Sequence, residues 1–179
     1  SMALSKSGIQ PEPKGWTEAS SVFVALKNQN QRRDFEIVAT VYGDKRMADR
    51  FRKTIGDLSA KAEDRTAAFE NLLRMKLPDT GALLMKLSAN AADPQRVQWI
   101  RGIGMAPDEN SPSFLMELFP KLDTAGREAA VQSLGSSETG GRRLAEGLTS
   151  GLVKRGEISA FVARLMRGYD KADITAAVE

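Results

Sequence analysis

The repeat that indicates how this chain folds is clearest over residues 93–134, which read DPQRVQWIRGIGMAPDENSPSFLMELFPKLDTAGREAAVQSL. Two arginines in this segment, Arg96 and Arg127, are 31 residues apart, and each opens a run with the apolar spacing of an α-helix. Asp93 and Asp123 lie just upstream, where a carboxylate can accept hydrogen bonds from the free amides of a helix start. The segment therefore predicts a helix that recurs about every 31 residues.

The same period continues on both sides of this segment. Four arginines, which we call the arginine ladder, open the second helix of successive predicted pairs at steps of 32, 31 and 31 residues: Arg33, Arg65, Arg96 and Arg127. Apolar side chains follow them at equivalent offsets, first Ile37, Phe69, Ile100 and Val131, then Val41, Leu72, Ile103 and Leu134. A further step of 31 residues reaches Ile158, where the arginine is absent and the helical pattern continues.

Short helices account for nearly all of the chain after residue 15, and strand signals are almost absent. We expect eleven helices, beginning at or near Thr17, Gln31, Lys45, Lys61, Asp79, Asp93, Ser111, Asp123, Thr139, Glu157 and Lys171. A lone pair of such helices cannot bury its apolar faces, whereas stacked pairs bury a continuous core. The sequence therefore predicts an all-α fold, a right-handed α-solenoid of about five stacked helical hairpins, with a plain helical bundle as the alternative.

Residues 1–15 differ from the rest of the chain, because they hold two prolines, two glycines and few large apolar side chains. We expect a tag remnant and a linker in this segment. Residues 16–179 are expected to form a single repeat domain, cut from a longer protein.

Composition narrows the chemistry that this chain can perform. The 179 residues include no cysteine and no histidine. These absences exclude a zinc site of the Cys/His kind, an iron–sulfur cluster, a haem with a histidine ligand, and Ser-His-Asp or Cys-His catalysis. We therefore expect that the chain binds no cofactor or metal, has no catalytic residues and is not an enzyme.

Charge and hydropathy bear on the partners of the chain. It carries 26 basic and 23 acidic residues, and residues 91–179 are close to neutral, so a nucleic-acid partner is not favoured. No apolar run reaches the roughly 18–20 residues of a membrane span, so no membrane insertion is expected.

The arginine ladder has a structural explanation and a functional one. In the first, an aspartate just upstream, such as Asp64 or Asp123, caps the helix, and the arginine bridges to the neighbouring repeat. In the second, the arginines form a ligand-binding row on one face of the molecule. We favour the structural explanation and keep the possible interaction face as the alternative.

Two further motifs have an ordinary explanation. Residues 135–143, GSSETGGRR, have the glycines of a phosphate loop but lack its Lys-Ser/Thr pair and a preceding strand, so we expect a turn between helices. Its arginines are expected to pair with Glu138 or Glu146. Residues 44–57, DKRMADRFRKTIGD, could follow phosphates, but a solvated helix with internal charge pairs is favoured. Trp16 and Trp99 are expected to pack in the core.

The end of the chain resembles a known helical segment. The resemblance covers most of residues 16–179 and is clearest over residues 118–170, LFPKLDTAGREAAVQSLGSSETGGRRLAEGLTSGLVKRGEISAFVARLMRGYD. The matching positions are Phe119, Pro120, Leu122, Arg127, Ala130, Leu134, Leu144, Gly151, Ile158 and Leu165. They are similar to the HEAT-like helical-repeat segment of large planctomycete-type multidomain proteins described as haem-binding or membrane-bound dehydrogenases.

In that family the helical array lies between a β-propeller-like dehydrogenase region and a c-type cytochrome that carries a Cys-x-x-Cys-His motif. This chain has neither, so the resemblance implies a connecting array that holds no haem and none of the redox residues. It also implies an exported parent protein and a periplasmic or extracytoplasmic location.

These observations favour a non-catalytic scaffold that binds a protein partner or the neighbouring domains of its parent chain. The alternative is a nucleic-acid-binding HEAT-like module with the architecture of the alkylpurine DNA glycosylases. A third hypothesis, an enzyme that uses carboxylates alone, requires an aspartate or glutamate desolvated in a cleft.

Overall fold

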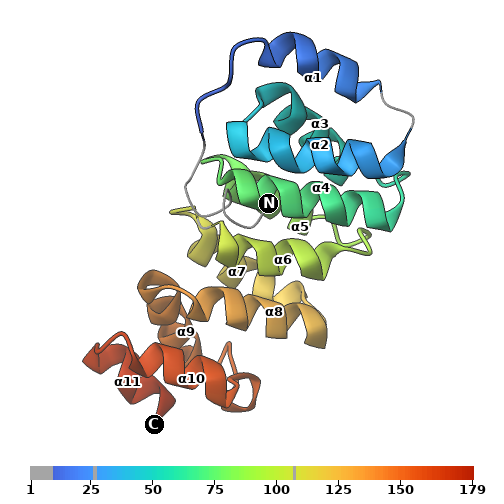
Figure 1. Ribbon diagram of the computed structural model, residues 1–179. Coiled ribbons are helices and arrows are strands. Elements are labelled where there is room, and N and C mark those ends of the chain that lie inside the picture. The colour runs from blue at the N-terminus through green and yellow to red at the C-terminus, as the bar shows by residue number, and fades with distance from the viewer. Residues whose placement is uncertain (1–9, 26–27, 107) are drawn as a thin grey trace. The chain divides into compact units, whose positions relative to one another are not determined.

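The computed structural model describes residues 10–25, 28–106 and 108–179, and every regular element within them is helical (Figure 1), so the all-α prediction is confirmed over these residues. The α-helices are α1 (Trp16–Val24), α2 (Gln29–Tyr42), α3 (Lys45–Gly56), α4 (Ala62–Met75), α5 (Thr80–Ser88), α6 (Arg96–Met105), α7 (Ser111–Leu118), α8 (Thr124–Gly135), α9 (Glu138–Ser150), α10 (Ala160–Arg167) and α11 (Ala172–Val178). Short 3₁₀ helices follow α7 (Phe119–Lys121) and α9 (Arg155–Glu157). The chain divides into two compact units, residues 1–77 and 78–179.

The first unit contains α1–α4. α3 packs closely against α4, and α2 contacts both of them as well as α1. Side chains at helical spacing fill the core between α3 and α4: Met47, Phe51, Ile55, Phe69, Leu72 and Met75. The amphipathic pattern of these two helices therefore accounts for most of the packing in this unit.

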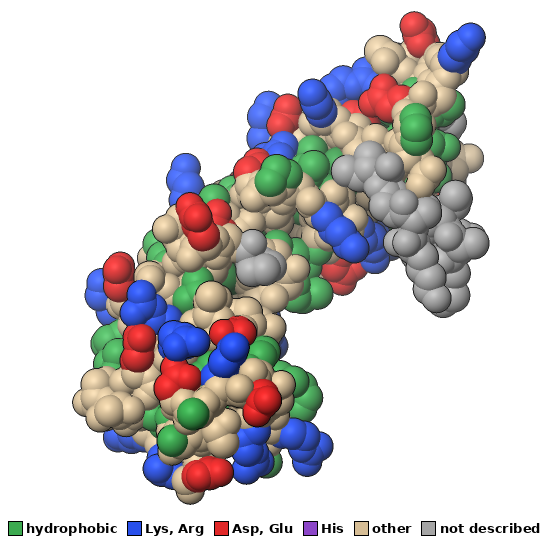
Figure 2. All heavy atoms as spheres, turned by 90° about the vertical axis from the view of Figure 1, so that its left-hand side faces the viewer, with side chains coloured by type: hydrophobic (Ala, Val, Ile, Leu, Met, Phe, Trp, Pro, Cys, Tyr) green, Lys and Arg blue, Asp and Glu red, His purple; other side chains and the backbone are tan. Residues whose placement is uncertain are grey.

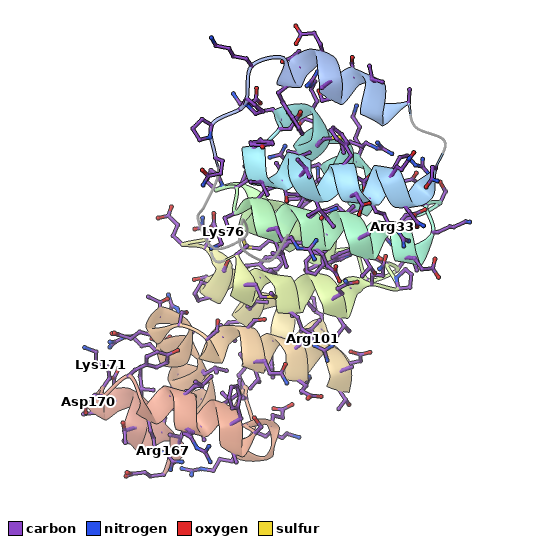
Figure 3. All side chains as sticks on the ribbon, in the orientation of Figure 1. Arg33, Lys76, Arg101, Arg167, Asp170 and Lys171 are labelled. Carbon is purple, nitrogen blue, oxygen red and sulfur yellow. The ribbon has the colours of Figure 1, made fainter. Side chains whose placement is uncertain are left out.

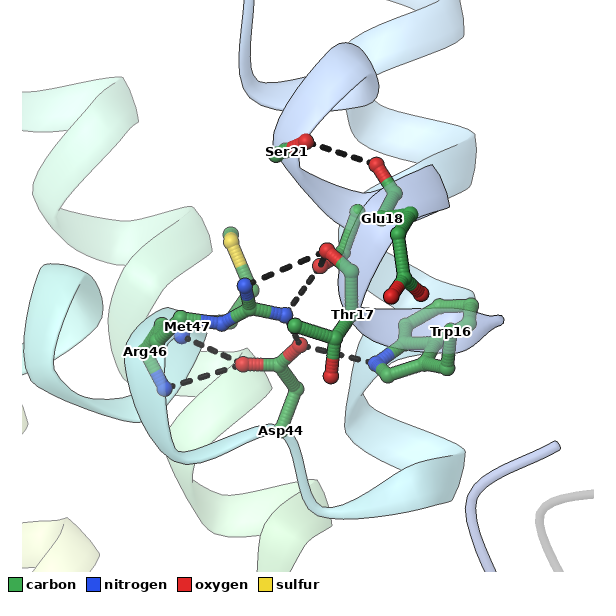
Figure 4. A network of polar contacts seen from close by, with 8 residues as sticks. Trp16, Thr17, Glu18, Ser21, Asp44, Arg46 and Met47 are labelled. Carbon is green, nitrogen blue, oxygen red and sulfur yellow. Dashed lines mark hydrogen bonds and ion pairs between the residues drawn. The ribbon is translucent and has the colours of Figure 1, made fainter. Parts of the chain in front are cut away.

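Trp16 anchors α1 to the first unit, as the sequence predicts. Its ring stacks on Phe35 with centroids 5.4 Å apart and meets Tyr42 edge-on at 4.7 Å. Its indole N–H donates to Asp44 Oδ2 at 2.8 Å, and the other Asp44 oxygen accepts from two backbone N–H groups in the first turn of α3 (Figure 4). One buried carboxylate thus caps α3 and holds α1 in place.

The second unit contains α5–α11. α6, α8 and α10 lie side by side, with α8 in contact with both of the others (Figure 1). The helices that precede these three in each pair are α5, α7 and α9. They form a second row, in which α7 contacts both α5 and α9. α11 packs on α9 and α10.

Small residues allow α6, α8 and α10 to approach each other closely. A Cβ atom at Gly104 would lie 2.8 Å from the Cα of Ser133, whose hydroxyl donates to the Ile100 carbonyl at 2.7 Å. One helix further on, the Gly135 carbonyl accepts a hydrogen bond from the Tyr169 hydroxyl at 2.8 Å. Hydroxyl groups therefore bond α8 to α6, and the turn that follows α10 to α8, across 33 or 34 residues of sequence.

The start of α6 differs from the prediction. The helix begins at Arg96 rather than at Asp93, because the Asp93 carboxylate accepts from the Gln95 N–H and a turn precedes the helix. The other oxygen of this carboxylate accepts from the indole N–H of Trp99 at 2.9 Å. Trp99 is fully buried, so its predicted place in the core is confirmed.

The predicted starts of two later helices also differ from the structure: the start of α9 was predicted too late and that of α10 too early. α9 begins before Thr139, because the Ser137 hydroxyl caps it. α10 is capped by Ser159, so Glu157 and Ile158 lie in the preceding turn and the ladder period ends there. Much of the predicted tag remnant and linker, residues 1–9, lies outside the described residues.

Candidate functional site

Three members of the arginine ladder bind the end of the preceding helix. Arg65 donates from Nε and Nη2 to the Ile55 carbonyl oxygen, at 3.0 and 2.7 Å. Arg96 donates from Nε to the Ser88 carbonyl oxygen at 2.7 Å. Arg127 does the same to the carbonyl of Leu122, at 3.1 Å, just after the 3₁₀ turn that follows α7.

These contacts serve a clear chemical purpose. The last carbonyl groups of a helix have no partner within the helix, and the partial negative charge of the helix dipole gathers there. A guanidinium group satisfies those carbonyls with charge-assisted hydrogen bonds. Arg65, Arg96 and Arg127 therefore each close a helix pair on itself, a contact that the sequence did not predict.

Arg127 also makes the predicted bridge to the next repeat. Its Nη1 lies 3.1 Å from Glu157 Oε1 in the turn before α10, and its guanidinium lies over the Phe119 ring at 5.1 Å. Burial raises the pKa of Glu157, but hydrogen bonds from the Lys154 N–H and from Arg127 outweigh it, so the pKa lies below the ordinary value of 4.5. This glutamate is therefore held in its charged form as a partner for the arginine.

The predicted aspartate caps are confirmed only in part. Asp123 accepts from the Gly126 N–H at 2.8 Å and caps α8. Asp93 instead holds a turn and Trp99, as described above. Asp64 lies within the first turn of α4 and is not the cap residue of that helix. Its negative charge there interacts favourably with the helix dipole.

Arg33 does not behave like the other three ladder members. It is exposed (Figure 3), and its side chain makes no hydrogen bond or ion pair with another described residue. In α4 and α8 the ladder arginine is the fourth residue after the helix cap, and in α2, which Asn28 caps, that position is Arg32. The first repeat is therefore in register from Arg32, one residue earlier than predicted.

The shifted register explains which residues of α2 are buried. Phe35 and Ala39 are buried, whereas Ile37, expected in the core, is 41% exposed. Four residues after Arg32 stands Glu36, at the position where the other second helices bury Phe69, Ile100 and Val131. A carboxylate thus occupies a core position of the repeat.

Glu36 borders an open pocket of about 270 Å³ in the first unit, between α2, α3 and α4. Charged side chains from all three helices line it: Arg32, Arg33, Glu36, Arg50 and Asp64. Within the described residues, the only ion pair at this pocket joins Arg50 Nη2 to Glu36 Oε1, at 3.8 Å. We call it the arginine pocket.

The electrostatics of the arginine pocket centre on Glu36, whose side chain is only 16% exposed. Burial is the main reason that the pKa of Glu36 lies above its ordinary value of 4.5. Asp64 acts in the same direction, and the three arginines act against it. Sequence reasoning missed this site, although an acidic residue at an apolar position of the repeat would have been a signal for it.

A pocket of about 320 Å³ lies at the equivalent place in the second unit, between α6 and the turn that leads into α8. The residues that line it include Arg96, Val97, Ile100 and Gly126, which correspond in the repeat to Arg32, Arg33, Glu36 and Asp64. The Arg96 guanidinium already donates to the Ser88 carbonyl at the end of α5, so it has a structural role.

The outer face of the second helices offers a different kind of surface. In the second unit, α6, α8 and α10 expose a set of polar and apolar side chains that we call the outer face: Arg101, Met105, Glu128, Gln132, Arg164 and Arg167. On the side of the molecule that Figure 2 shows, basic and acidic side chains are interspersed rather than gathered by sign. That side therefore lacks the single-sign basic patch of a nucleic-acid groove, whereas the outer-face residues themselves include three arginines and one glutamate.

The GSSETGGRR segment forms the turn between α8 and α9 and the first turns of α9. Arg142 pairs with Glu138 at 3.4 Å and with Asp173 of α11 at 2.7 Å. Arg143 pairs with Glu146 at 2.8 Å. The predicted charge pairs are confirmed, and these arginines stabilise the end of the second unit.

Neither a cluster suited to a metal ion nor a membrane span is found in the described part of the chain. No group of three or more acidic side chains there is arranged to hold a metal. Each described helix is too short or too polar to cross a bilayer.

Comparisons with protein-family models, with curated proteins and with solved structures find no match to this chain. What the chain does is therefore inferred from its own residues.

Proposed function

We propose that this chain is a non-catalytic helical-repeat scaffold, a right-handed α-solenoid of about five HEAT-like hairpins that binds other proteins. One observation carries the proposal: the same arginine-to-carbonyl contact recurs in three successive helix pairs, from Arg65, Arg96 and Arg127. A device repeated at each pair is what a modular array requires, because every module must hold its own two helices together.

Within this proposal, the binding surface is the outer face, because the side chains that hold the helix pairs together are engaged in the fold. Arg65 is only 1% exposed, so it is not available to a partner. Arg101 and Met105 lie one turn apart on α6 and are both exposed, and Met105 is 70% exposed. An extended array binds through many such weak contacts, spread over successive helices.

On the resemblance alone, we extend the proposal to the parent protein. The array would connect or dock the domains of an exported dehydrogenase that carries a c-type cytochrome. The coding sequence on both sides of this segment tests that part: a Cys-x-x-Cys-His motif downstream and an export signal upstream support it. A gene that encodes neither feature would contradict the proposed redox parent, and the scaffold proposal would stand without it.

A cross-linking experiment in the complete parent protein tests the scaffold. A photoreactive residue at Met105 on α6 is compared with one at Glu117, which is exposed on α7 in the other helix row. We expect adducts with another domain or another protein from Met105 in clear excess over Glu117. Equal yields from the two positions would reject the outer face as the binding surface.

The nucleic-acid alternative is favoured by one feature, the cluster of basic residues around α3 and the arginine pocket. It predicts retention on heparin that falls steeply with salt, since each phosphate contact adds to the salt slope. Elution at low salt would leave the protein scaffold as the better account.

A further inference from the structure

We infer that the arginine pocket binds a small tetrahedral dianion, such as sulfate or phosphate, between α2, α3 and α4. This inference is independent of the scaffold, because the pocket lies within the first unit and uses none of the outer-face residues of the second unit.

The repeat does not need a charged side chain at the position of Glu36. The position of Glu36 is filled by a buried phenylalanine, isoleucine or valine in α4, α6 and α8. Burying a carboxylate there costs free energy, as the raised pKa of Glu36 records. A costly polar group at a core position is typical of a site rather than of a structural element.

The pocket brings three arginines together. Arg32, Arg33 and Arg50 all line the pocket, yet the one ion pair there among the described residues, between Arg50 and Glu36, is long at 3.8 Å. Guanidinium groups present planar forks of N–H donors that match the oxygens of a sulfate or phosphate. Three positive groups face two carboxylates, so the pocket favours an anion.

The charged groups of the pocket lie beside apolar side chains. Phe51 and Ala68 are buried side chains of the pocket wall, and they lower the local dielectric, which strengthens the attraction between a bound anion and the arginines. A volume of about 270 Å³ also leaves room for a tetrahedral ion together with water.

In the unliganded pocket, Glu36 acts as the internal counter-ion of Arg50. A bound dianion competes with this carboxylate for the same guanidinium. Anything that neutralises Glu36 therefore strengthens binding.

The test is a titration of the whole chain with sodium sulfate at constant ionic strength, followed by calorimetry or NMR shifts. Sulfate remains a dianion between pH 4.5 and 7, so only the protein titrates. We expect saturable binding that Arg50→Gln weakens about tenfold or more, because a charge-assisted contact is lost. Arg101→Gln, which removes an exposed arginine of the second unit, serves as the matched control and leaves the affinity unchanged.

A second pair of variants keeps the inference testable if Arg50→Gln fails to fold. Arg33 is exposed, so Arg33→Gln should keep its stability and still weaken sulfate binding severalfold. Glu36→Gln removes the internal competitor and should tighten binding. Weakening by Glu36→Gln, or equal losses from Arg33→Gln and Arg101→Gln, would overturn the inference.

The pH dependence completes the test. The charged groups that face Glu36 are Arg32 and Arg33 on its own helix, Arg50 on α3 and Asp64 on α4. The arginines keep their charge throughout, so sulfate affinity should rise as the pH falls towards 4.5 and Glu36 takes up a proton. This rise should disappear in Glu36→Gln, and a rise of the same size in that variant contradicts the assigned site. Inorganic phosphate at pH 7, used in the same way, compares the two anions.

Discussion

The arginine pocket of the first unit and the pocket beside α6 in the second lie at equivalent places of the repeat, but they use their charges differently. In the second unit Arg96 holds a helix end, and Asp93 holds Trp99. The two neighbouring helix positions there are the apolar Val97 and Ile100. In the first unit the corresponding positions are Arg33 and Glu36, which hold no helix end.

This difference indicates how one repeat of an array acquires a polar pocket. Where an arginine satisfies the end of a helix, the neighbouring positions remain apolar and the repeat stays structural. Where the first repeat shifts its register by one residue, charges enter core positions and a polar pocket results. Substitutions at equivalent positions of the two units test this contrast.

Glu36 and Ile100 occupy equivalent positions, and exchanging their side chains should change the free energy of unfolding by very unequal amounts. Ile100→Glu places a carboxylate at a fully buried site and should destabilise the protein by about 4 kcal/mol or more. Glu36→Ile should change stability by less than about 1 kcal/mol, because it removes a desolvated charge. Urea denaturation measures both. Similar losses in the two variants would mean that the pockets do not differ as described, and Ile100→Val, expected to cost about 1 kcal/mol, controls for the size change.

Within the arginine ladder, the effect of truncation should follow the contacts. Arg65→Ala leaves the Ile55 carbonyl without its buried partner and should cost about 2–4 kcal/mol. Arg96→Ala should cost about 1–3 kcal/mol, and Arg33→Ala less than about 0.5 kcal/mol. Thermal and urea unfolding give the order, and an unchanged melting temperature in Arg96→Ala would refute the structural role of the ladder.

The ion pair between Arg127 and Glu157 should contribute only modestly to stability, because both side chains remain partly exposed. A double-mutant cycle with alanine at the two positions should give a coupling of about 0.5–1 kcal/mol. The coupling should fall as salt is added. A coupling near zero at low salt would show that Arg127 acts only on its own helix pair.

The smallest expected effect is the pH dependence of Glu36. Its pKa in the folded protein lies above the ordinary value of 4.5, so the folded state binds the proton more tightly than the unfolded state. Its contribution to stability is therefore present below pH 4.5 and is lost as the pH rises through the folded pKa. The free energy of unfolding of the wild type, relative to Glu36→Gln, should fall between pH 4 and pH 7.

Asp44 provides the opposite case in the same unit. Burial raises its pKa, but hydrogen bonds from Arg46, the Met47 N–H and Trp16 together lower it below 3.8. Its contribution is present above pH 3.8 and is lost as the pH falls through the folded pKa. Relative to Asp44→Asn, the wild type should therefore lose stability on acidification. If Glu36→Gln and Asp44→Asn gave the same sign, the assigned environments would be wrong.

The helices and the buried tryptophans were predictable from the sequence, because apolar spacing and capping residues are local signals. The partners of the ladder arginines were not, since nothing in the spacing distinguishes a carbonyl of the same helix pair from one in the next. The register of the first repeat was missed because Arg32 and Arg33 are adjacent, and only the cap at Asn28 selects between them. The arginine pocket was missed because its charges come from three helices.

The ladder contacts also bear on how the chain acquires its structure during synthesis. The arginines reach carbonyl groups only 10, 8 and 5 residues earlier in the chain. Loops of about ten residues close within roughly 10–100 ns, and folds rich in such near-neighbour contacts fold rapidly. Each helix pair can thus close as it leaves the ribosome, before the next pair has been made.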